Sequence, residues 1–220
     1  MILPAHLNPP TMRMRHAAVY WLASLATLGA GAALVCPLGE CGVGGFDRAG
    51  LALAHVWRSE AVDAWAGGIT WFGSLAVLLP LALLAAWQLR RAGSGRAALF
   101  VPAALLGAAT LSHAVKLWVA RPRPELFSHL APLPADWSYP SAHAMQATAL
   151  ALSLWLVLAR RRGGGVSLAL ALGTGVLLVG LSRIYLQVHY PSDVLAGALA
   201  AAFWVMGLHA LLCKRTEDRA

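Results

Sequence analysis

Charged residues are scarce in this sequence, and their scarcity excludes an ordinary soluble domain. Asp, Glu, Lys and Arg make up 12% of the 220 residues, and 59% are apolar, whereas a soluble domain is about a quarter charged and about half apolar. The formal net charge of +8 could serve nucleic-acid binding, but such proteins gather Lys and Arg on one exposed face. Here the basic residues form short patches between apolar runs, so we expect a membrane protein and no nucleic-acid partner.

Several other features are also missing. The chain has no internal repeat, no polar low-complexity tail and no set of Cys and His residues with zinc-finger spacing. The first long apolar run, Ala17 to Cys36, lacks a clear small-residue cleavage site and is long enough to span a bilayer, so it is interpreted as a retained helix and not as a signal peptide. Residues 1–220 are therefore expected to form a single membrane-embedded domain.

What the sequence does contain is a series of long apolar runs. A helix needs roughly 20 apolar residues to cross the hydrocarbon core, and six runs reach or nearly reach that length. They cover residues 17–36, 68–89, 97–118, 143–159, 166–186 and 192–213. The predicted fold class is all-α, a polytopic membrane protein whose six transmembrane helices form a bundle.

Every second break around these runs is basic, which predicts the topology. The basic breaks hold Arg13 and Arg15, then Arg90, Arg91 and Arg96, then Arg160 to Arg162, and finally Lys214 and Arg215. Because Lys and Arg concentrate on the cytoplasmic side, both termini are expected in the cytoplasm and residues 37–67, 119–142 and 187–191 on the outer face. The predicted location is the inner (cytoplasmic) membrane of the cell.

The first outer loop mixes charged and apolar residues, among them Asp47, Leu51 and Trp57. This mixture suits a helix that lies in the membrane interface, and a solvated loop packed on the helix ends is the alternative. Cys36 and Cys41 lie at the start of the loop. On the outer side of a bacterial inner membrane they could form a disulfide or remain two packed thiols.

Three polar groups near the helix ends are the basis of the functional prediction, because charged side chains are expensive in a membrane protein. The first group follows the third run, the second opens the fourth run, and the third joins the fifth run to the sixth. They consist of Lys116, Arg121 and Arg123, of Pro140, Ser141, Ala142 and His143, and of Ser182, Arg183, His189 and Asp193. The predicted topology places all three groups at the outer membrane face.

These residue types suit phosphoryl transfer. Fixed cations stabilise the charge on the oxygens of a phosphoryl group, and Ser141 as an N-cap would leave helix-start amides free for an anion. His143 would donate a proton, while Asp193, four residues after His189, would orient that imidazole for attack. Taken singly, each group has a structural alternative: cations that reach lipid headgroups, an ordinary capped helix, and a structural His–Asp pair.

Taken together, the three groups resemble the signature of the type 2 phosphatidic acid phosphatase superfamily, which includes membrane lipid phosphatases and the vanadium haloperoxidases. The matching elements are Lys116-x6-Arg123-Pro124, Pro140-Ser141-Ala142-His143 and Ser182-Arg183-x5-His189-x3-Asp193, all within residues 116–193. The haloperoxidases are typically soluble, so the membrane phosphatases fit this chain better. The family usually has Gly where this chain has Ala142, and we expect the small methyl group to be tolerated.

The resemblance implies a metal-independent phosphatase that needs no cofactor and acts through a phosphohistidine. By that analogy His189 attacks, Asp193 orients it, and His143 protonates the leaving oxygen. The implied phosphate-binding residues are Lys116, Arg123, Ser141 and Arg183, with supporting roles for Pro124, Ser182 and Ala142. No residue is expected to bind a metal.

The expected substrate is a lipid phosphate or lipid pyrophosphate in contact with membrane lipids. Undecaprenyl pyrophosphate is narrowly preferred because the site is expected to face outward, while phosphatidic acid, phosphatidylglycerol phosphate, lipid A and other isoprenoid diphosphates also fit. The alternatives are a lipid phosphotransferase with the same site and a catalytically inactive phosphate- or lipid-binding membrane protein. The two histidines and Asp193 favour an enzyme, since binding an anion needs only the cations.

Overall fold

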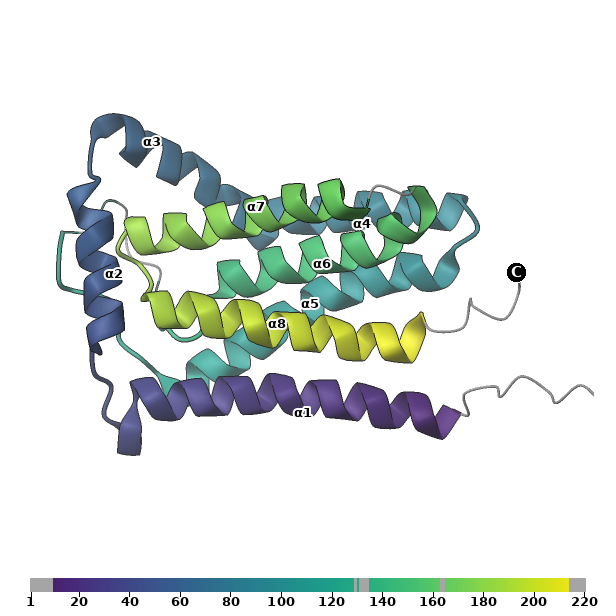
Figure 1. Ribbon diagram of the computed structural model, residues 1–220, viewed down its shortest axis with the longest axis horizontal. Coiled ribbons are helices and arrows are strands. Elements are labelled where there is room, and N and C mark those ends of the chain that lie inside the picture. The colour runs from purple at the N-terminus through teal and green to yellow at the C-terminus, as the bar shows by residue number, and fades with distance from the viewer. Residues whose placement is uncertain (1–9, 129, 131–134, 163–164, 214–220) are drawn as a thin grey trace, which may run out of the picture.

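The computed structural model describes residues 10–128, 130, 135–162 and 165–213, and every regular element in that part of the chain is helical (Figure 1). The elements are α1 (Pro10–Val35), η1 (Pro37–Gly39), α2 (Gly45–Val56), α3 (Glu60–Ile69), η2 (Thr70–Gly73), α4 (Leu75–Arg91), α5 (Gly95–Val119), α6 (Ala142–Arg162), α7 (Gly165–Tyr185) and α8 (Pro191–Leu212). The long helices form one elongated bundle, which confirms the predicted fold class.

Six crossings are available in the described residues. Helices α1, α5, α6, α7 and α8 are each long and apolar enough to span a membrane, and the pair Glu60–Gly73 and Leu75–Arg91 provides a sixth crossing with a bend of 47°. The observed bounds differ from the predicted runs mainly at this sixth crossing. Residues 68–73 were expected to start the transmembrane helix of run 68–89, and they form the end of α3 and η2 instead.

The bend has a local cause at Ser74. Its backbone is extended, with φ −79° and ψ 144°, and its hydroxyl donates to the Trp71 carbonyl at 2.8 Å. A serine that bonds a nearby carbonyl offers the backbone an alternative to continuous helix. The η2 segment therefore ends at Gly73 and a new helix starts at Leu75, which leaves η2 packed against α6 and α7.

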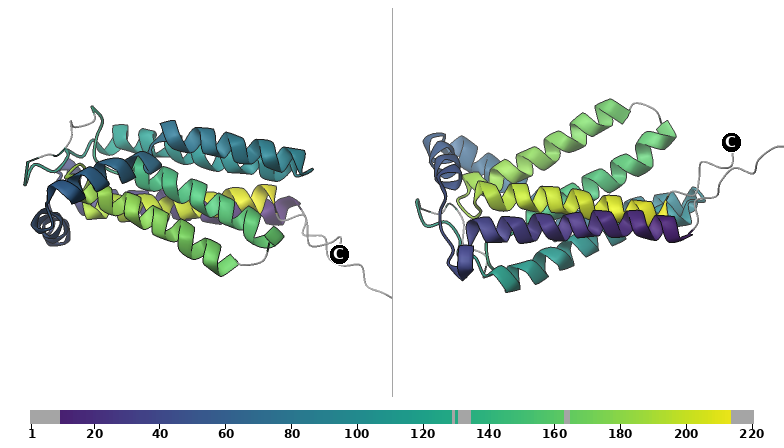
Figure 2. Two further views of the ribbon diagram at one scale, coloured as in Figure 1. Left: turned by 90° about the horizontal axis from the view of Figure 1, so that it is seen from above. Right: turned by 60° about the horizontal axis from the view of Figure 1, so that its bottom comes forward.

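Helices α1 and α8 lie side by side along much of their length (Figure 2). The Ser24 hydroxyl donates to the Ala200 carbonyl at 2.8 Å, and the rings of Trp21 and Trp204 stack with their centroids 5.7 Å apart. Helix α6 packs against α4, α5, α7 and α8. Its first turn is therefore central in the bundle, and the first turn of α8 is held next to it.

The segment predicted as the first outer loop contains two helices, while its position in the membrane interface stays a prediction. Helix α2 lies across the ends of the long helices, roughly perpendicular to the bundle axis, and α3 leads back to it (Figure 1). Cys36 and Cys41 form a disulfide just before α2, so the choice left open by the sequence is resolved. This segment covers the end of the bundle that carries the polar groups.

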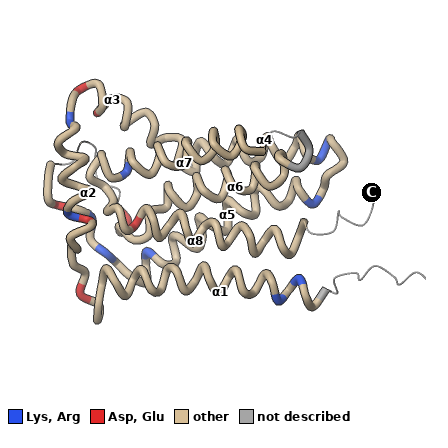
Figure 3. Tube along the Cα trace, in the orientation of Figure 1, with Lys and Arg blue, Asp and Glu red and all other residues tan. Residues whose placement is uncertain are grey.

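The two ends of the bundle differ in charge (Figure 3). Acidic residues of the described chain gather at the α2 end together with several basic ones, whereas only basic residues mark the opposite end. The opposite end carries Arg90 and Arg91 in the last turn of α4. Lys214 and Arg215, which the topology prediction also used, lie outside the described residues.

Candidate active site

The three polar groups converge at the α2 end of the bundle, as their positions in the sequence predicted. Lys116 lies in the last turn of α5 and Arg183 in the last turn of α7. His143 and Asp193 lie in the first turns of α6 and α8. His189 lies in the short connection between α7 and α8 and is only 1% exposed. Four helix ends thus supply one small site.

Two of the predicted phosphate-binding cations share a carboxylate. The Lys116 Nζ lies 3.2 Å from Asp136 Oδ2, and the Arg123 guanidinium pairs with the same carboxylate. Both cations also donate to backbone carbonyls, Lys116 to Trp137 and Arg123 to Val188. Lys116 and Arg123 are buried whereas the Asp136 side chain is 41% exposed, so the carboxylate is the part of this cluster that reaches solvent.

The third predicted cation, Arg183, is held by a residue of η2. The Arg183 Nη1 donates to Thr70 Oγ1 at 2.6 Å, and Arg183 is buried. Its Nε is also buried and has no hydrogen-bond partner among the described residues. A buried guanidinium with an unused donor is suited to bind an anion, because the unpaired donor otherwise costs free energy.

Helix α6 begins directly after Ser141, which is fully buried. The Ser141 hydroxyl accepts from the Ala144 amide at 3.5 Å, the position of an N-cap. The Ser141 amide itself donates to the Asp193 carbonyl at 3.1 Å and is therefore already engaged. The amides that this helix start offers to an anion begin at Ala142.

The predicted pair of His189 and Asp193 is present. The Nδ1 of His189 lies 3.5 Å from Asp193 Oδ2, and α8 begins at Pro191 with Tyr190 as its N-cap residue. The Ser138 hydroxyl donates to Oδ2 at 2.5 Å and lies 3.4 Å from His189 Nδ1. With Nδ1 turned toward the carboxylate, the other ring nitrogen, Nε2, lies 3.4 Å from the Arg123 Nη1.

The electrostatic surroundings favour a neutral His189. Burial lowers its pKa well below the usual value, and the positive charges of Lys116, Arg183 and Arg123 lower it further. Partial burial would raise the pKa of Asp136, but the charges of Lys116 and Arg123 outweigh burial and hold it below its usual value. Burial and the nearby charges therefore favour a neutral His189 imidazole beside three cations and one partly exposed carboxylate.

The residues expected to have supporting roles lie around this arrangement. Ser182 is fully buried and its hydroxyl donates to the Val179 carbonyl at 2.7 Å within α7, so that hydroxyl is used by its own helix. Pro124 is buried directly after Arg123. Ala142 is the first residue of α6 and is half-buried.

Three residues of the site were missed in the sequence. Asp136 and Ser138 precede Pro140 by four and two residues, and their closeness to the helix start was the one available signal. No sequence feature indicated that Thr70 belongs to the site, because it lies 113 residues from Arg183 in the chain and inside an apparently uninterrupted apolar run. Its place in the site depends on the bend at Ser74.

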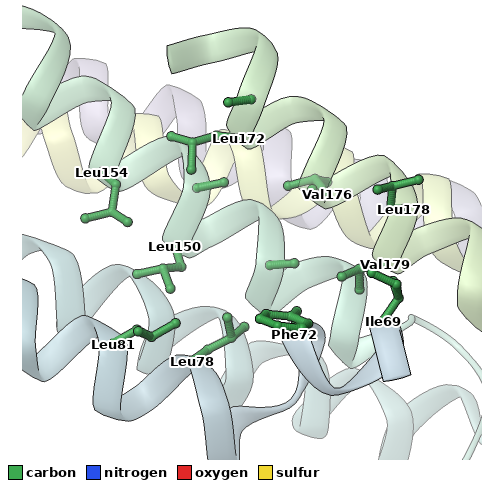
Figure 4. Close-up of a pocket in the computed structure, with 14 residues that line it drawn as sticks. Ile69, Phe72, Leu78, Leu81, Leu150, Leu154, Leu172, Val176, Leu178 and Val179 are labelled. Atoms are coloured by element: carbon green, nitrogen blue, oxygen red, sulfur yellow. The ribbon is translucent and has the colours of Figure 1, made fainter. Parts of the chain in front are cut away.

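An apolar cavity of about 360 Å³ adjoins the site between the η2–α4 segment, α6 and α7 (Figure 4). Phe72, Ala147 and Val179 are among its lining residues. Ala147 lies one helical turn after His143, and Val179 lies one turn before Arg183. The cavity therefore reaches from the side of the bundle to the level of the polar residues.

Comparisons with known proteins identify the family of the chain. Residues 97–217 match the PAP2 superfamily. The chain is 29% identical over 161 residues to phosphatidylglycerophosphatase B of Bacillus subtilis (strain 168). This alignment covers 69% of this chain and 73% of that protein.

Two crystal structures are similar in fold. A transmembrane PAP2 type phosphatidylglycerolphosphate phosphatase from Bacillus subtilis superposes with a TM-score of 0.66 at 21% identity, over 93% of this chain and 94% of that one. Aquifex aeolicus LpxE superposes with a TM-score of 0.57 at 27% identity, over 73% of this chain and 92% of that one. The family match and the membrane-spanning fold together confirm the resemblance seen in the signature. The chain belongs to the PAP2 superfamily and is a membrane lipid phosphatase.

Proposed function

We propose that this enzyme hydrolyses a lipid phosphomonoester through a phosphohistidine formed on His189. The observation that carries the proposal is the asymmetric environment of that imidazole. Its Nδ1 faces the Asp193 carboxylate at 3.5 Å, and its Nε2 lies 3.4 Å from the Arg123 guanidinium. An imidazole held in this way presents a lone pair on Nε2 beside cations that would bind the phosphoryl oxygens.

The reaction would proceed in two steps. The Nε2 lone pair of His189 attacks phosphorus, the bond from phosphorus to the lipid oxygen breaks, and His143 gives a proton to the departing oxygen. Water then attacks the phosphohistidine, gives a proton back to His143, and releases inorganic phosphate with neutral His189. Lys116, Arg123 and Arg183 would stabilise the charge on the equatorial oxygens in both steps.

The charges of the site favour a monoester over a diphosphate. Asp136 pairs with Lys116 and Arg123, which leaves two of the three positive charges of the clamp uncompensated. A phosphate monoester carries about −1.5 to −2 charge at pH 7, which nearly neutralises these two positive charges. The similar protein of Bacillus subtilis is a phosphatidylglycerophosphatase. Both points favour such a monoester over the undecaprenyl pyrophosphate that the sequence first suggested.

The apolar cavity suits the hydrocarbon part of the substrate. Its lining is almost entirely aliphatic and aromatic, and it ends next to the helical turns that carry His143 and Arg183. A lipid whose phosphate lies among the cations could place a chain between α4, α6 and α7. The cavity offers that chain an apolar environment like the bilayer that it leaves, so a lipid can bring its phosphate to the site without exposing its chain to water.

A substrate panel tests the proposal. Purified protein in detergent is given phosphatidylglycerol phosphate, phosphatidic acid, undecaprenyl pyrophosphate and p-nitrophenyl phosphate, and phosphate release is measured. The glycerophospholipid monoesters should give the highest kcat/KM. A clear preference for undecaprenyl pyrophosphate would overturn the choice of monoester, and the absence of phosphate release from every lipid would overturn the proposed function.

The same assay tests the mechanism. No three His, Cys, Asp or Glu side chains of the described part of the chain gather as metal ligands would, and the proposed clamp consists of Lys and Arg. Activity should therefore survive saturating EDTA, and vanadate should inhibit because a five-coordinate adduct on His189 resembles the transition state. Loss of turnover in EDTA with recovery in magnesium would contradict this mechanism.

A further inference from the structure

Arg121 is a buried cation next to the site that the proposed phosphate clamp does not use. It is 1% exposed, so it does not reach lipid headgroups. Its Nη1 donates to Asp193 Oδ1 at 2.6 Å and to Ser192 Oγ at 2.9 Å. Its Nη2 donates to Asp47 Oδ2 at 2.8 Å and to the Gly42 carbonyl at 3.1 Å. Both terminal nitrogens are therefore committed to the protein, and the Nε, like that of Arg183, has no hydrogen-bond partner among the described residues.

The partner on the other side of Arg121 is Asp47 of α2, which is 3% exposed. Besides Arg121, Asp47 accepts from the Ser192 amide at 2.9 Å and from the Ser192 hydroxyl at 2.7 Å. Helix α2 also packs directly on the start of α8, because a Cβ added at Gly50 would lie 2.5 Å from Pro191 Cγ. Helix α2 is thus fastened to the turn that carries Asp193.

The Asp193 carboxylate is held on both oxygens. Oδ1 accepts from Arg121, and Oδ2 accepts from Ser138 and from the Tyr190 amide at 3.0 Å. The Arg121 guanidinium also lies over the Tyr190 ring, 3.8 Å from its centroid. These contacts fix the plane of the carboxylate and turn Oδ2 toward the Nδ1 of His189.

We propose that Arg121 and Asp47 are positioning residues for the Asp193–His189 pair, so that α2 sets the orientation of the nucleophile. This inference rests on the proposed function of His189. An orienting carboxylate selects the imidazole tautomer only while its own geometry is fixed. Removal of Arg121 would also leave two carboxylates buried without their shared cation, which is strongly unfavourable. The effect should appear in turnover and not in substrate affinity, because the three cations of the clamp are untouched.

The experiment compares Arg121→Gln, Arg121→Lys and Asp47→Asn with wild type on the best substrate of the panel. Loss of an outer-shell partner typically costs roughly 10- to 100-fold, and we expect a fall of that size in kcat for Arg121→Gln with KM within about twofold. Arg121→Lys should recover part of the loss, because Lys keeps the charge but cannot bridge both carboxylates. Asp47→Asn, which keeps the shape of the side chain, should show a smaller loss of kcat. Arg58→Gln is the matched control, since Arg58 donates to Ser128 at the same end of the molecule.

A double-mutant comparison separates positioning from a general structural role. Adding Arg121→Gln to Asp193→Asn should lower kcat no further, because Arg121 acts through Asp193. A further loss in the double variant, or wild-type kcat in Arg121→Gln, would overturn the inference while leaving the proposed function intact.

The ring-nitrogen NMR signals of His189 provide a readout that does not need turnover. Assigned with a His189→Gln variant, they should report a proton on Nδ1 in wild type and mixed tautomers in Arg121→Gln and Asp47→Asn. If the wild-type protein releases phosphate from no lipid, the proposed function fails, and this measurement still decides the inference. Unchanged signals in both variants would overturn it.

Discussion

His143 and His189 lie in one site, but their surroundings differ. His189 is 1% exposed and lies against Asp193 and Arg123, whereas His143 is half-buried next to Gly73 and Val179. The difference predicts different roles. His189→Ala should abolish phosphate release from every substrate, because the nucleophile is gone.

His143→Ala should lose activity in proportion to the need of the leaving group for a proton. General acid catalysis contributes roughly 10²–10⁴-fold, so a loss of that size is expected on a lipid monoester, whose alkoxide is a poor leaving group. The loss should be smaller on p-nitrophenyl phosphate, which releases a stable phenolate. Steady-state rates of both variants on both substrates check this. Equal losses for His143→Ala on the two substrates would assign it to binding, and activity in His189→Ala would refute the nucleophile.

The lowered pKa of His189 predicts the acid side of the pH profile. For a histidine with the usual pKa of about 6.5, the neutral fraction would fall about tenfold between pH 7.5 and pH 5.5. Burial and then the charges of Lys116, Arg183 and Arg123 keep His189 neutral in this range. Single-turnover release of p-nitrophenol should therefore fall by less than about twofold between pH 7.5 and 5.5. The measurement is made in His143→Ala, so that the second imidazole does not contribute, and a tenfold fall would contradict the assignment.

At the residue scale, the sequence indicated which residues form the candidate site, but not which distant residues contact them. His189 and Asp193 are four residues apart at a helix start, so their contact follows from local geometry. Arg121 and Asp47 are 74 residues apart, and nothing local indicates that they share a hydrogen bond. Contacts of this kind depend on how whole helices pack, which one sequence does not state.

At the scale of elements, the positions of the long helices followed from apolar length alone. The bend at Ser74 did not, because Gly68 to Gly73 remain apolar enough to extend the run, and the break depends on one side chain that bonds its own backbone. The sequence also left residues 37–67 as either an interfacial helix or a solvated loop. The bend nevertheless matters for the site, since it places Thr70 against Arg183 and forms one wall of the apolar cavity.

Two glycines of α7 allow a matched test of that cavity. A Cβ atom added at Gly175 or at Gly173 meets no atom within 4 Å, but only Gly175 lines the cavity. Gly175→Leu should lower kcat/KM for a long-chain lipid monoester roughly tenfold, the scale of a few displaced methylene contacts. It should leave p-nitrophenyl phosphate hydrolysis unchanged.

Gly173→Leu is the control and should match wild type on both substrates. Initial rates over a range of lipid concentrations give the comparison. If the two leucine variants behave alike on the lipid, the hydrocarbon chain does not occupy the cavity.

At the scale of the whole molecule, charge distinguishes the two ends (Figure 3). If the purely basic end is cytoplasmic, the candidate site faces outward. Ala135 and Ala92 are both exposed, Ala135 in the segment before α6 and Ala92 in the α4–α5 turn at the basic end. In a background in which Cys213 is replaced by Ser, Ala135→Cys should react with a membrane-impermeant thiol reagent in intact cells, and Ala92→Cys only after lysis. The reverse labelling would place the site in the cytoplasm.

The overall architecture was the most predictable level, because apolar length and the signature spacing are both written along the chain. The packing of α1 on α8 and of α2 across the bundle end was not predictable, since it depends on tertiary contacts such as those of Ser24 with Ala200. The first turns of α6 and α8, where the candidate site forms, are joined by another such contact, in which the Ser141 amide donates to the Asp193 carbonyl.

The bend at Ser74 has a kinetic consequence. Two side chains that line the cavity beside it, Phe72 and Leu81, are 59% and 46% exposed, so the cavity opens through the side of the bundle and not toward the aqueous phase. A lipid that enters there arrives by lateral diffusion within the bilayer. Its encounter rate is set by its mole fraction among the surrounding lipids, so adding inert lipid at constant total substrate slows the enzyme, whereas diluting the vesicle suspension with buffer leaves the rate per enzyme unchanged.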